Sequence, residues 1–309
     1  MDFSVIIFAP LAYLLAVWVL LGNGLTILAV FRFEKLRTRA NMYIVSLATS
    51  DALVGILLFF FGSLYIPSWR PWFDSTEFVC VGMLSWAYVT VVCSWFNMCL
   101  IALDRYIYIA QPYLYERYMT EKNIAGAIVT VWVLAFVYGT IPVYYNTFST
   151  STRCTTREVI PLMYRSFLSA GLFLFCCLCT GALYIKITLI TLHQKKNIAR
   201  VGRENARNYR VDRGSLKALR LFLTVFGCLF ICWSPYCFVE LVDGYFGVAN
   251  IWLRSSMLLG FLNSGINFFI YPYFNQEFRQ ALRVLLCCCK SPQQTSVVDT
   301  HTATGTRLS

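Results

Sequence analysis

The sequence predicts an all-α membrane protein, a bundle of seven transmembrane helices followed by a short amphipathic eighth helix. Its 309 residues are 58% hydrophobic and only 13% charged, and the mean hydropathy is +0.62. Soluble domains carry about 25% charged residues, so this chain lacks the charge to cover a surface exposed to water. The composition therefore excludes an ordinary soluble enzyme and a disordered chain.

Seven runs of the sequence contain almost no charge, and Asp51 is the only charged residue in them. A transmembrane helix needs about 20 apolar residues, whereas a strand of a membrane barrel needs only about 10. So little charge between seven such runs also disfavours a stack of buried helices in a soluble protein. In chain order, the runs are 8–31, 41–69, 78–103, 123–152, 166–185, 221–239 and 255–276.

These runs predict one helical domain over residues 1–289. The seven spans are expected at 8–31, 41–66, 78–110, 123–145, 163–192, 215–242 and 251–273. The eighth helix is expected at 275–288, and residues 290–309 are expected to form a disordered cytoplasmic tail.

Lysine and arginine set the expected orientation. Most of the 26 basic residues lie in the connections after spans one, three and five, in the tail or at adjoining helix ends. The positive-inside rule places this side in the cytoplasm, with the N-terminus outside and the C-terminus inside. The basic stretch 193–220 is expected to face anionic lipid, and no nucleic-acid partner is expected. The basic residues on the outer side are Arg70, Arg153, Arg157, Arg165 and Arg254.

The 13 cysteines fall into three groups. Most lie in apolar helix and are expected to pack as small side chains. Cys80 and Cys154 both lie on the outer, oxidising side, where a disulfide between them is physically allowed. Cys287, Cys288 and Cys289 follow the amphipathic segment and are candidates for palmitoylation, with unmodified thiols as the alternative. Zinc is disfavoured because no histidine is near them.

Polar residues inside the spans are candidate functional residues. Asp51 lies near the middle of the second span, where a carboxylate costs about 2.5–3.5 kcal/mol. Asn263 and Asn267 are four residues apart and share one face of the seventh span. Together with Ser94 and Ser264 at similar depth, they could supply oxygen ligands to a sodium ion held by Asp51. A water-filled hydrogen-bond network around a protonated Asp51 is the alternative.

At the cytoplasmic end of the third span the chain reads Asp104-Arg105-Tyr106, followed by Pro112. With this motif the sequence resembles the rhodopsin-like (class A) G protein-coupled receptors, and the resemblance extends from about residue 9 to residue 289. The other matching positions follow in the family's order and at its depths. They are Gly22-Asn23, the stretch 47–51, Cys80 with Cys154, Trp132, Cys232-Trp233-Ser234-Pro235, Asn267-Phe268-Phe269-Ile270-Tyr271 and Phe278-Arg279.

The resemblance implies a receptor in the plasma membrane, not an enzyme. Such a receptor converts binding of a small extracellular ligand into activation of a heterotrimeric G protein, with arrestin and receptor kinases as further partners and membrane lipid around it. The resemblance also implies the Cys80–Cys154 disulfide and no cofactor other than an allosteric sodium ion. The implied sodium ligands are Asp51, Ser94, Asn263, Ser264 and Asn267. The alternative is a channel or transporter that uses Asp51 as an ion site.

The resemblance further implies how the switch works. Trp233 would sense the ligand, and Pro235 would kink the sixth span because proline removes a helical hydrogen bond. Arg105 would meet the G protein and be restrained at rest by Asp104. The implied coupling residues are Asp104, Arg105, Tyr106, Pro112, Tyr184, Trp233, Pro235 and Tyr271, of which the two tyrosines of spans five and seven would swing toward Arg105.

Three positions depart from the family pattern. Phe268 replaces the proline of the seventh-span motif, and Cys176 replaces the proline of the fifth span. Ser215 occupies the position of the acid on span six that would pair with Arg105. We therefore expect the resting state to be held less tightly, because Arg105 lacks this acidic partner.

The ligand class is constrained by residues that the chain lacks. Amine receptors place an aspartate where this chain has Ala87, and opsins need a lysine in span seven, where none occurs. The expected pocket is mostly apolar and suits a flat nucleoside-like or lipid-like ligand, with a resemblance to adenosine and lipid-amide receptors. A cationic ligand held by Glu240, near the rim, or by Asp243 is the alternative. The expected pocket residues are Met83, Ala87, Tyr88, Val91, Trp233, Tyr236, Glu240, Met257 and Phe261.

Overall fold

The computed structural model describes residues 3–201 and 213–287, with the side chains of residues 6–193 and 220–286. Within these ranges the chain forms helices and no strand. Six helical segments are long and apolar enough to cross a membrane: Ile6–Arg32, Arg39–Ser63, Glu77–Ala110, Glu121–Thr150, Met163–His193 and Arg220–Phe246. A seventh helix, α11 (Asn250–Phe274), has a similar length but is more polar, because it carries four buried Asn and Ser side chains.

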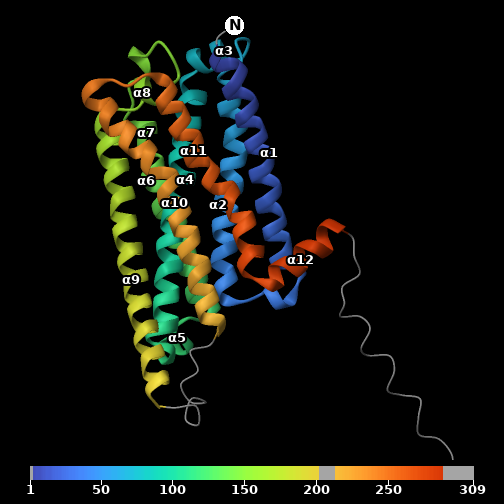
Figure 1. Cartoon of the computed structure of the whole chain (residues 1–309). Helices are drawn as coiled ribbons and strands as arrows, with labels where there is room; N and C mark the ends of the chain where they lie inside the picture. Colours follow the sequence, from blue (N-terminus) through green and yellow to red (C-terminus); the bar gives the residue numbers. More distant parts are fainter. Residues whose placement is uncertain (1–2, 202–212, 288–309) are drawn as a thin grey trace, which may run out of the picture.

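The seven long helices lie side by side as a bundle (Figure 1), which confirms the predicted fold class. The short helix α12 (Gln276–Cys287) runs across the bundle at the end opposite to the N-terminus. Its Phe278, Ala281 and Leu282 are buried against the bundle, whereas Arg279 and Arg283 are exposed. The predicted tail lies outside the described residues. The other long helices are α1 (Phe3–Arg32), α2 (Arg39–Ser63), α4 (Glu77–Ala110), α6 (Glu121–Gly139), α9 (Ser169–Val201) and α10 (Arg213–Phe246).

Within the predicted fourth span, 123–145, the helix is not continuous. Helix α6 stops at Gly139, and a separate turn, α7 (Ile141–Tyr144), follows it. Pro142 has no N–H to continue the helical hydrogen-bond pattern. Gly139 also lies so close to α4 that a Cβ there would be 2.4 Å from the backbone nitrogen of Val89. Only glycine permits this approach of the two helices.

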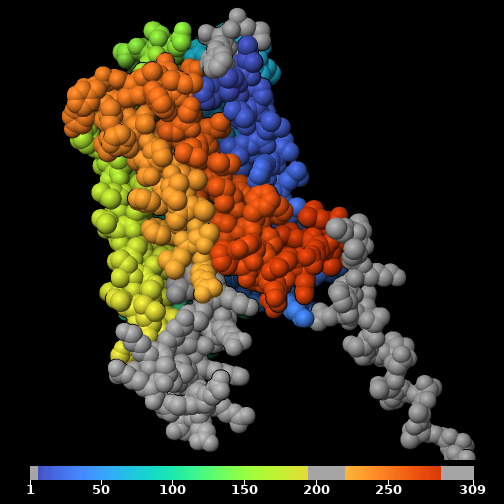
Figure 2. Space-filling view, in the orientation of Figure 1, coloured from blue at the N-terminus to red at the C-terminus, as the bar shows by residue number. Residues whose placement is uncertain are grey.

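Helix α4 is the central element, since it packs against α2, α6, α9 and α10. At its N-terminal end Cys80 is bonded to Cys154, with a Cα–Cα distance of 5.7 Å, which confirms the predicted disulfide. The bond ties α4 to the loop that carries α8 (Thr156–Val159). Two further short helices, α3 (Arg70–Ser75) and α5 (Pro112–Tyr118), lie just before and just after α4. The side chains of α9, α10 and α11 form a continuous surface in Figure 2.

Helices α1 and α11 approach each other closely at Gly22. A Cβ at this position would lie 2.9 Å from the Cβ of Phe268, the residue that replaces the family's proline. One position further along α1, the Asn23 side chain donates to the Ser264 carbonyl at 2.9 Å. The proline inside α11 is Pro272 instead.

Candidate functional site

A chamber of about 50 Å³, here called the inner chamber, lies among α4, α9, α10 and α11. Eight of the nine predicted pocket residues line it: Ala87, Tyr88, Val91, Trp233, Tyr236, Glu240, Met257 and Phe261. The ninth, Met83, is buried in the packing of α4 and does not line it. Further lining residues, which the sequence did not single out as pocket residues, include Phe61, Trp95, Arg165 and Ser169.

Aromatic rings surround Trp233 in the wall of the inner chamber. Its ring packs edge-to-face on Trp95, with centroids 5.8 Å apart, and on Phe261 at 5.7 Å. A Cβ on Gly260 would come within 2.8 Å of the Trp233 ring, so the ring rests directly on the backbone of α11. Trp233 therefore couples the chamber to the packing between α4, α10 and α11.

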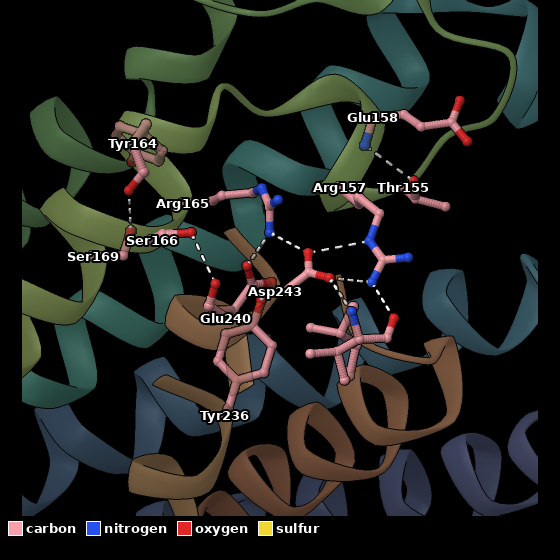
Figure 3. A network of polar contacts seen from close by, with 12 residues as sticks. Thr155, Arg157, Glu158, Tyr164, Arg165, Ser166, Ser169, Tyr236, Glu240 and Asp243 are labelled. Carbon is pink, nitrogen blue, oxygen red and sulfur yellow. Dashed lines mark hydrogen bonds and ion pairs between the residues drawn. The ribbon is translucent and has the colours of Figure 1, made fainter. Parts of the chain in front are cut away.

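Four charged side chains above the inner chamber form what we call the charge network: Arg157, Arg165, Glu240 and Asp243 (Figure 3). Arg165 comes from the π-helical turn η3 (Met163–Leu168), which leads into α9, and pairs with both acids of α10, reaching Asp243 at 3.0 Å. Arg157 of α8 holds Asp243 from the other side, with Nε 3.1 Å from Oδ2. The Tyr236 hydroxyl donates to Glu240 at 2.9 Å. The two positive and two negative charges therefore balance inside the network.

The charge network shows that Glu240, expected near the pocket rim, is not available as a free acid. Its side chain is only 1% exposed and is paired with Arg165 while it lines the inner chamber. In the sequence, Arg157 and Arg165 indicated only the orientation in the membrane and were not expected as partners of the two acids. A usable signal was present, because Glu240 and Asp243 are three residues apart on one helix face, and two buried acids need cationic partners.

A larger cavity of about 170 Å³, the outer chamber, lies outside the inner one and shares Phe61, Thr156, Tyr236, Glu240 and Met257 with it. The disulfide-bonded loop forms part of its wall through residues 153–158. Four arginines and two glutamates supply its charged lining: Arg70, Arg153, Arg157, Arg254, Glu158 and Glu240.

Glu158 shapes the loop of the outer chamber. Its Oε2 accepts hydrogen bonds from the backbone amides of Thr152, at 2.8 Å, and Arg153, at 2.9 Å. Burial by itself would raise the pKa of Glu158, but these bonds, the Thr152 hydroxyl and the Arg153 charge outweigh it and hold the pKa below its ordinary value. The carboxylate therefore serves as an acceptor for its own loop.

Deeper in the bundle the predicted sodium ligands lie together. The Asn267 amide donates to the Asp51 carboxylate at 2.9 Å. The other Asp51 oxygen and the side-chain oxygens of Ser94, Asn263 and Asn267 are buried without a hydrogen-bond partner among the described residues. Ser264 is buried beside Asn263 on α11. Buried oxygen atoms need a donor, a water molecule or an ion, so this set fits a hard cation.

At the C-terminal end of α4, Arg105 is held on two sides. Its Nε donates to Asp104 at 2.8 Å, and both side chains are buried. The guanidinium also lies over the rings of Tyr108, at 5.2 Å, and of Phe222 on α10, at 5.6 Å. Half-buried Tyr106 follows in the same helix.

Three further predicted coupling residues lie on α5, α9 and α11. Pro112 occupies the first turn of α5, a position that suits proline. The hydroxyls of Tyr184 and Tyr271 are buried and have no hydrogen-bond partner within the described ranges. Tyr184 of α9 packs on Phe226 of α10, and Tyr271 of α11 packs on Phe278 of α12. Each tyrosine therefore contacts the helix that follows its own in the chain.

Some predicted residues cannot be placed. Cys288 and Cys289 lie outside the described residues, and Cys287 ends α12 with its side chain outside the described set. The Ser215 side chain also lies outside it. These assignments stay predictions.

Comparison with known proteins decides the family. The sequence profile of the family described as "7 transmembrane receptor (rhodopsin family)" matches residues 22–271. The chain belongs to this family. It is therefore a ligand-activated receptor of the plasma membrane that acts through G proteins, and it is not an enzyme. Receptors of this family need no cofactor for their action.

Curated relatives align with most of the receptor. It is 29% identical to the 5-hydroxytryptamine receptor 4 of Rattus norvegicus over 301 residues, covering 87% of this chain and 73% of the relative. It is also 29% identical to the histamine H2 receptor of Cavia porcellus, covering 93% and 82%, and to the D(1B) dopamine receptor of Xenopus laevis, covering 92% and 70%. These relatives are named for amines, and they lend no support to the expected resemblance to adenosine and lipid-amide receptors.

Proposed function

We propose that a small extracellular molecule enters the outer chamber, reaches the inner chamber and moves α10 so that Arg105 becomes available to a heterotrimeric G protein. The single observation that carries this proposal is the course of α10. This one helix supplies Glu240 to the charge network, Trp233 to the inner chamber and Phe222 to the ring contact with Arg105. Pro235 lies inside the helix, between the first two.

The proline gives α10 a place to bend. It lacks the N–H that would bond to Ile231, and the missing bond weakens the helix one turn below it. A ligand that displaces Trp233 therefore acts close to the weakest turn of α10. Movement of the cytoplasmic half would carry Phe222 away from Arg105 and leave only its contacts within α4, to Asp104 and Tyr108, among the described residues.

The names of the relatives suggest an amine, but the acids of this site are already occupied. Ala87 stands where an amine receptor has its aspartate, and Arg157 and Arg165 neutralise the two acids of α10. An ammonium ion would have to displace an arginine from a buried carboxylate. We therefore propose that this receptor does not hold its ligand through the ammonium pairing typical of amine receptors.

Sodium is proposed as an allosteric ion at Asp51. The support is the set of buried, unpartnered oxygens on α2, α4 and α11 around one carboxylate. Asp51 would supply the charge, and Ser94, Asn263, Ser264 and Asn267 would supply neutral oxygens. An ion that binds one form of the bundle better than the other shifts the balance toward that form.

The orientation of the receptor in the membrane and the partners of its cytoplasmic face are also proposed. We propose that the N-terminus is outside and the C-terminus cytoplasmic, which places the disulfide on the oxidising side and Arg105 inside. Arrestin, receptor kinases and anionic lipid are proposed as partners of the cytoplasmic face, and the cysteines at 287–289 as acylation sites.

Guanine-nucleotide exchange on purified G protein tests the proposal. The full-length receptor is placed in lipid nanodiscs, and Phe222→Ala is compared with Leu223→Ala, a partly exposed neighbour on the same helix. A ring–cation contact contributes about 1 kcal/mol, so its loss should raise ligand-free exchange roughly fivefold. Equal exchange by the two variants would contradict the role of α10. Ion or solute flux through receptor vesicles without any exchange would favour a channel or transporter.

A further inference from the structure

The charged lining of the outer chamber is not balanced. Its four arginines face only two glutamates, and most of these six charged side chains already have a partner in the protein. Arg70 pairs with Asp74 at 3.4 Å, and Arg157 pairs with Asp243 in the charge network. Glu240 pairs with Arg165, and Glu158 accepts from its own loop. Arg153 and Arg254 are left.

Arg254 is the arginine placed to receive a ligand. It forms an ion pair with none of the acidic side chains that the structure describes. It is half-buried in α11, whereas Arg153 is exposed on the loop. The Arg254 guanidinium lies over the Tyr65 ring, 5.1 Å from the ring centroid. Stacking uses the face of a guanidinium and leaves its edge N–H groups available, in the geometry that matches a carboxylate.

The residues below Arg254 favour an apolar partner group. Met257, three residues further along α11, lines both chambers, and Phe61 and Tyr236 line both as well. The inner chamber continues with the rings of Tyr88, Trp233 and Phe261. A molecule that spans the two chambers would therefore meet a cation at one end and aromatic side chains at the other.

We propose that the ligand of this receptor carries a carboxylate or another small oxyanion, which Arg254 binds in the outer chamber while an apolar part of the ligand occupies the inner chamber. The inference rests on the proposed function for the use of these chambers as the ligand site. Binding of an anion would compensate a partly desolvated arginine, whereas a cation would bring a third positive charge beside Arg254 and Arg153.

Thermal unfolding of the purified full-length receptor tests the charge preference directly. The probe is benzoate, compared with benzylamine and benzamide at constant ionic strength, because the three share one ring and differ in charge. A cavity of roughly 150 Å³ holds benzene, so benzoate fits beside Arg254 within the outer chamber and probes the oxyanion site without filling the inner chamber. A molecule that binds the folded state raises the midpoint in a concentration-dependent way. Benzoate should raise it, and benzylamine and benzamide should not.

Two arginine variants locate the effect. Arg254→Gln should weaken the benzoate response about tenfold or more, since charge-assisted hydrogen bonds are lost. Arg117→Gln is the matched control, because Arg117 lies over the Tyr118 ring at 5.2 Å in α5, away from both chambers, and it should respond like the wild type. If Arg254→Gln does not fold, Arg254→Lys keeps the charge without the forked edge and should respond with intermediate strength.

Three results would overturn the proposal: no response to benzoate, an undiminished response in the Arg254 variant, or a larger response to benzylamine. The last would indicate a cationic ligand at the acids of α10. None of these measurements needs a G protein. A benzoate response without nucleotide exchange would therefore support the anion site and refute the coupling to a G protein. Nucleotide exchange without a benzoate response would support the coupling and refute the anion site.

Discussion

Arg165 of η3 and Glu240 of α10 form an ion pair in which both side chains are more than nine-tenths buried. Asp243 is the second partner of the same guanidinium, so Arg165 joins the start of the fifth membrane span to the outer end of the sixth. Removing one member of a buried pair leaves an uncompensated charge, whereas removing both can be nearly neutral.

Arg165→Met should therefore lower stability by about 3 kcal/mol, seen as a lower thermal midpoint of the purified receptor. The double variant Arg165→Met with Glu240→Met should recover much of the loss, because Arg157 still compensates Asp243. A double variant no more stable than Arg165→Met would show that the pair contributes beyond its charges.

The contact between Gly22 and Phe268 predicts a steric effect. Gly22→Ala should lower the thermal midpoint, since the new Cβ would lie 2.9 Å from the Phe268 Cβ and force α1 away from α11. Overpacking of this kind costs about 1–3 kcal/mol. Gly24→Ala is the control, because no atom lies within 4 Å of a Cβ there. In a Phe268→Gly background, which lacks the Cβ and the ring carbon that the new Cβ would meet, Gly22→Ala should no longer lower the midpoint. A loss that persists there would be assigned to another contact.

The lowered pKa of Glu158 predicts a pH-dependent loop. The folded loop favours the carboxylate, so the stabilisation is present above the ordinary pKa of glutamate and is lost as the pH falls through the lower folded value. Amide hydrogen exchange at Thr152 and Arg153, corrected for intrinsic rates, should accelerate in this acidic range. Glu158→Gln should show the faster exchange already at neutral pH.

The Cys154 amide provides an internal reference for that experiment, because it donates to Asp74 at 2.7 Å instead of to Glu158. Its protection should be unchanged in Glu158→Gln. If all three amides lose protection together, the loop opens as one unit and the bonds to Glu158 are not decisive.

The Asp51 cluster predicts a sodium effect. In the wild type, sodium should shift the balance of the bundle and so change ligand-free nucleotide exchange, with potassium at equal ionic strength as the control. Asp51→Asn keeps the size of the side chain and removes the charge, and it should abolish the difference between the two ions. A wild type that behaves alike in both salts would favour the water network around a protonated Asp51.

Much of the membrane architecture could be predicted because its causes are local in the chain. Hydropathy reveals most spans, and the four-residue step between Asn263 and Asn267 places both on the face that meets Asp51. The predicted pocket residues follow the same logic, since helical period and depth together select the inward positions.

The features that were missed depend on how separate segments meet. Arg165 reaches Glu240 only because a π-helical turn and a disulfide-bonded loop bring the start of the fifth span over α10. Pro142 marks the break after α6 in the sequence, but the close approach of the α4 backbone to Gly139 cannot be read from any pattern within residues 123–145. Met83 is an apolar residue of the kind expected in the pocket, but its side chain is buried in the packing of α4 and does not line the inner chamber.

The contact between Phe268 and Gly22 also has an evolutionary consequence. The Cβ and ring of Phe268 on α11 leave no room for a side chain on α1, so the two positions cannot vary independently. Descendants of this gene that keep phenylalanine at 268 are confined to glycine at 22, and a larger residue there becomes acceptable only after the Phe268 side chain is lost or the two helices move apart. Paired substitution at these two sites, 246 positions apart, would therefore be the trace that this contact leaves among orthologues.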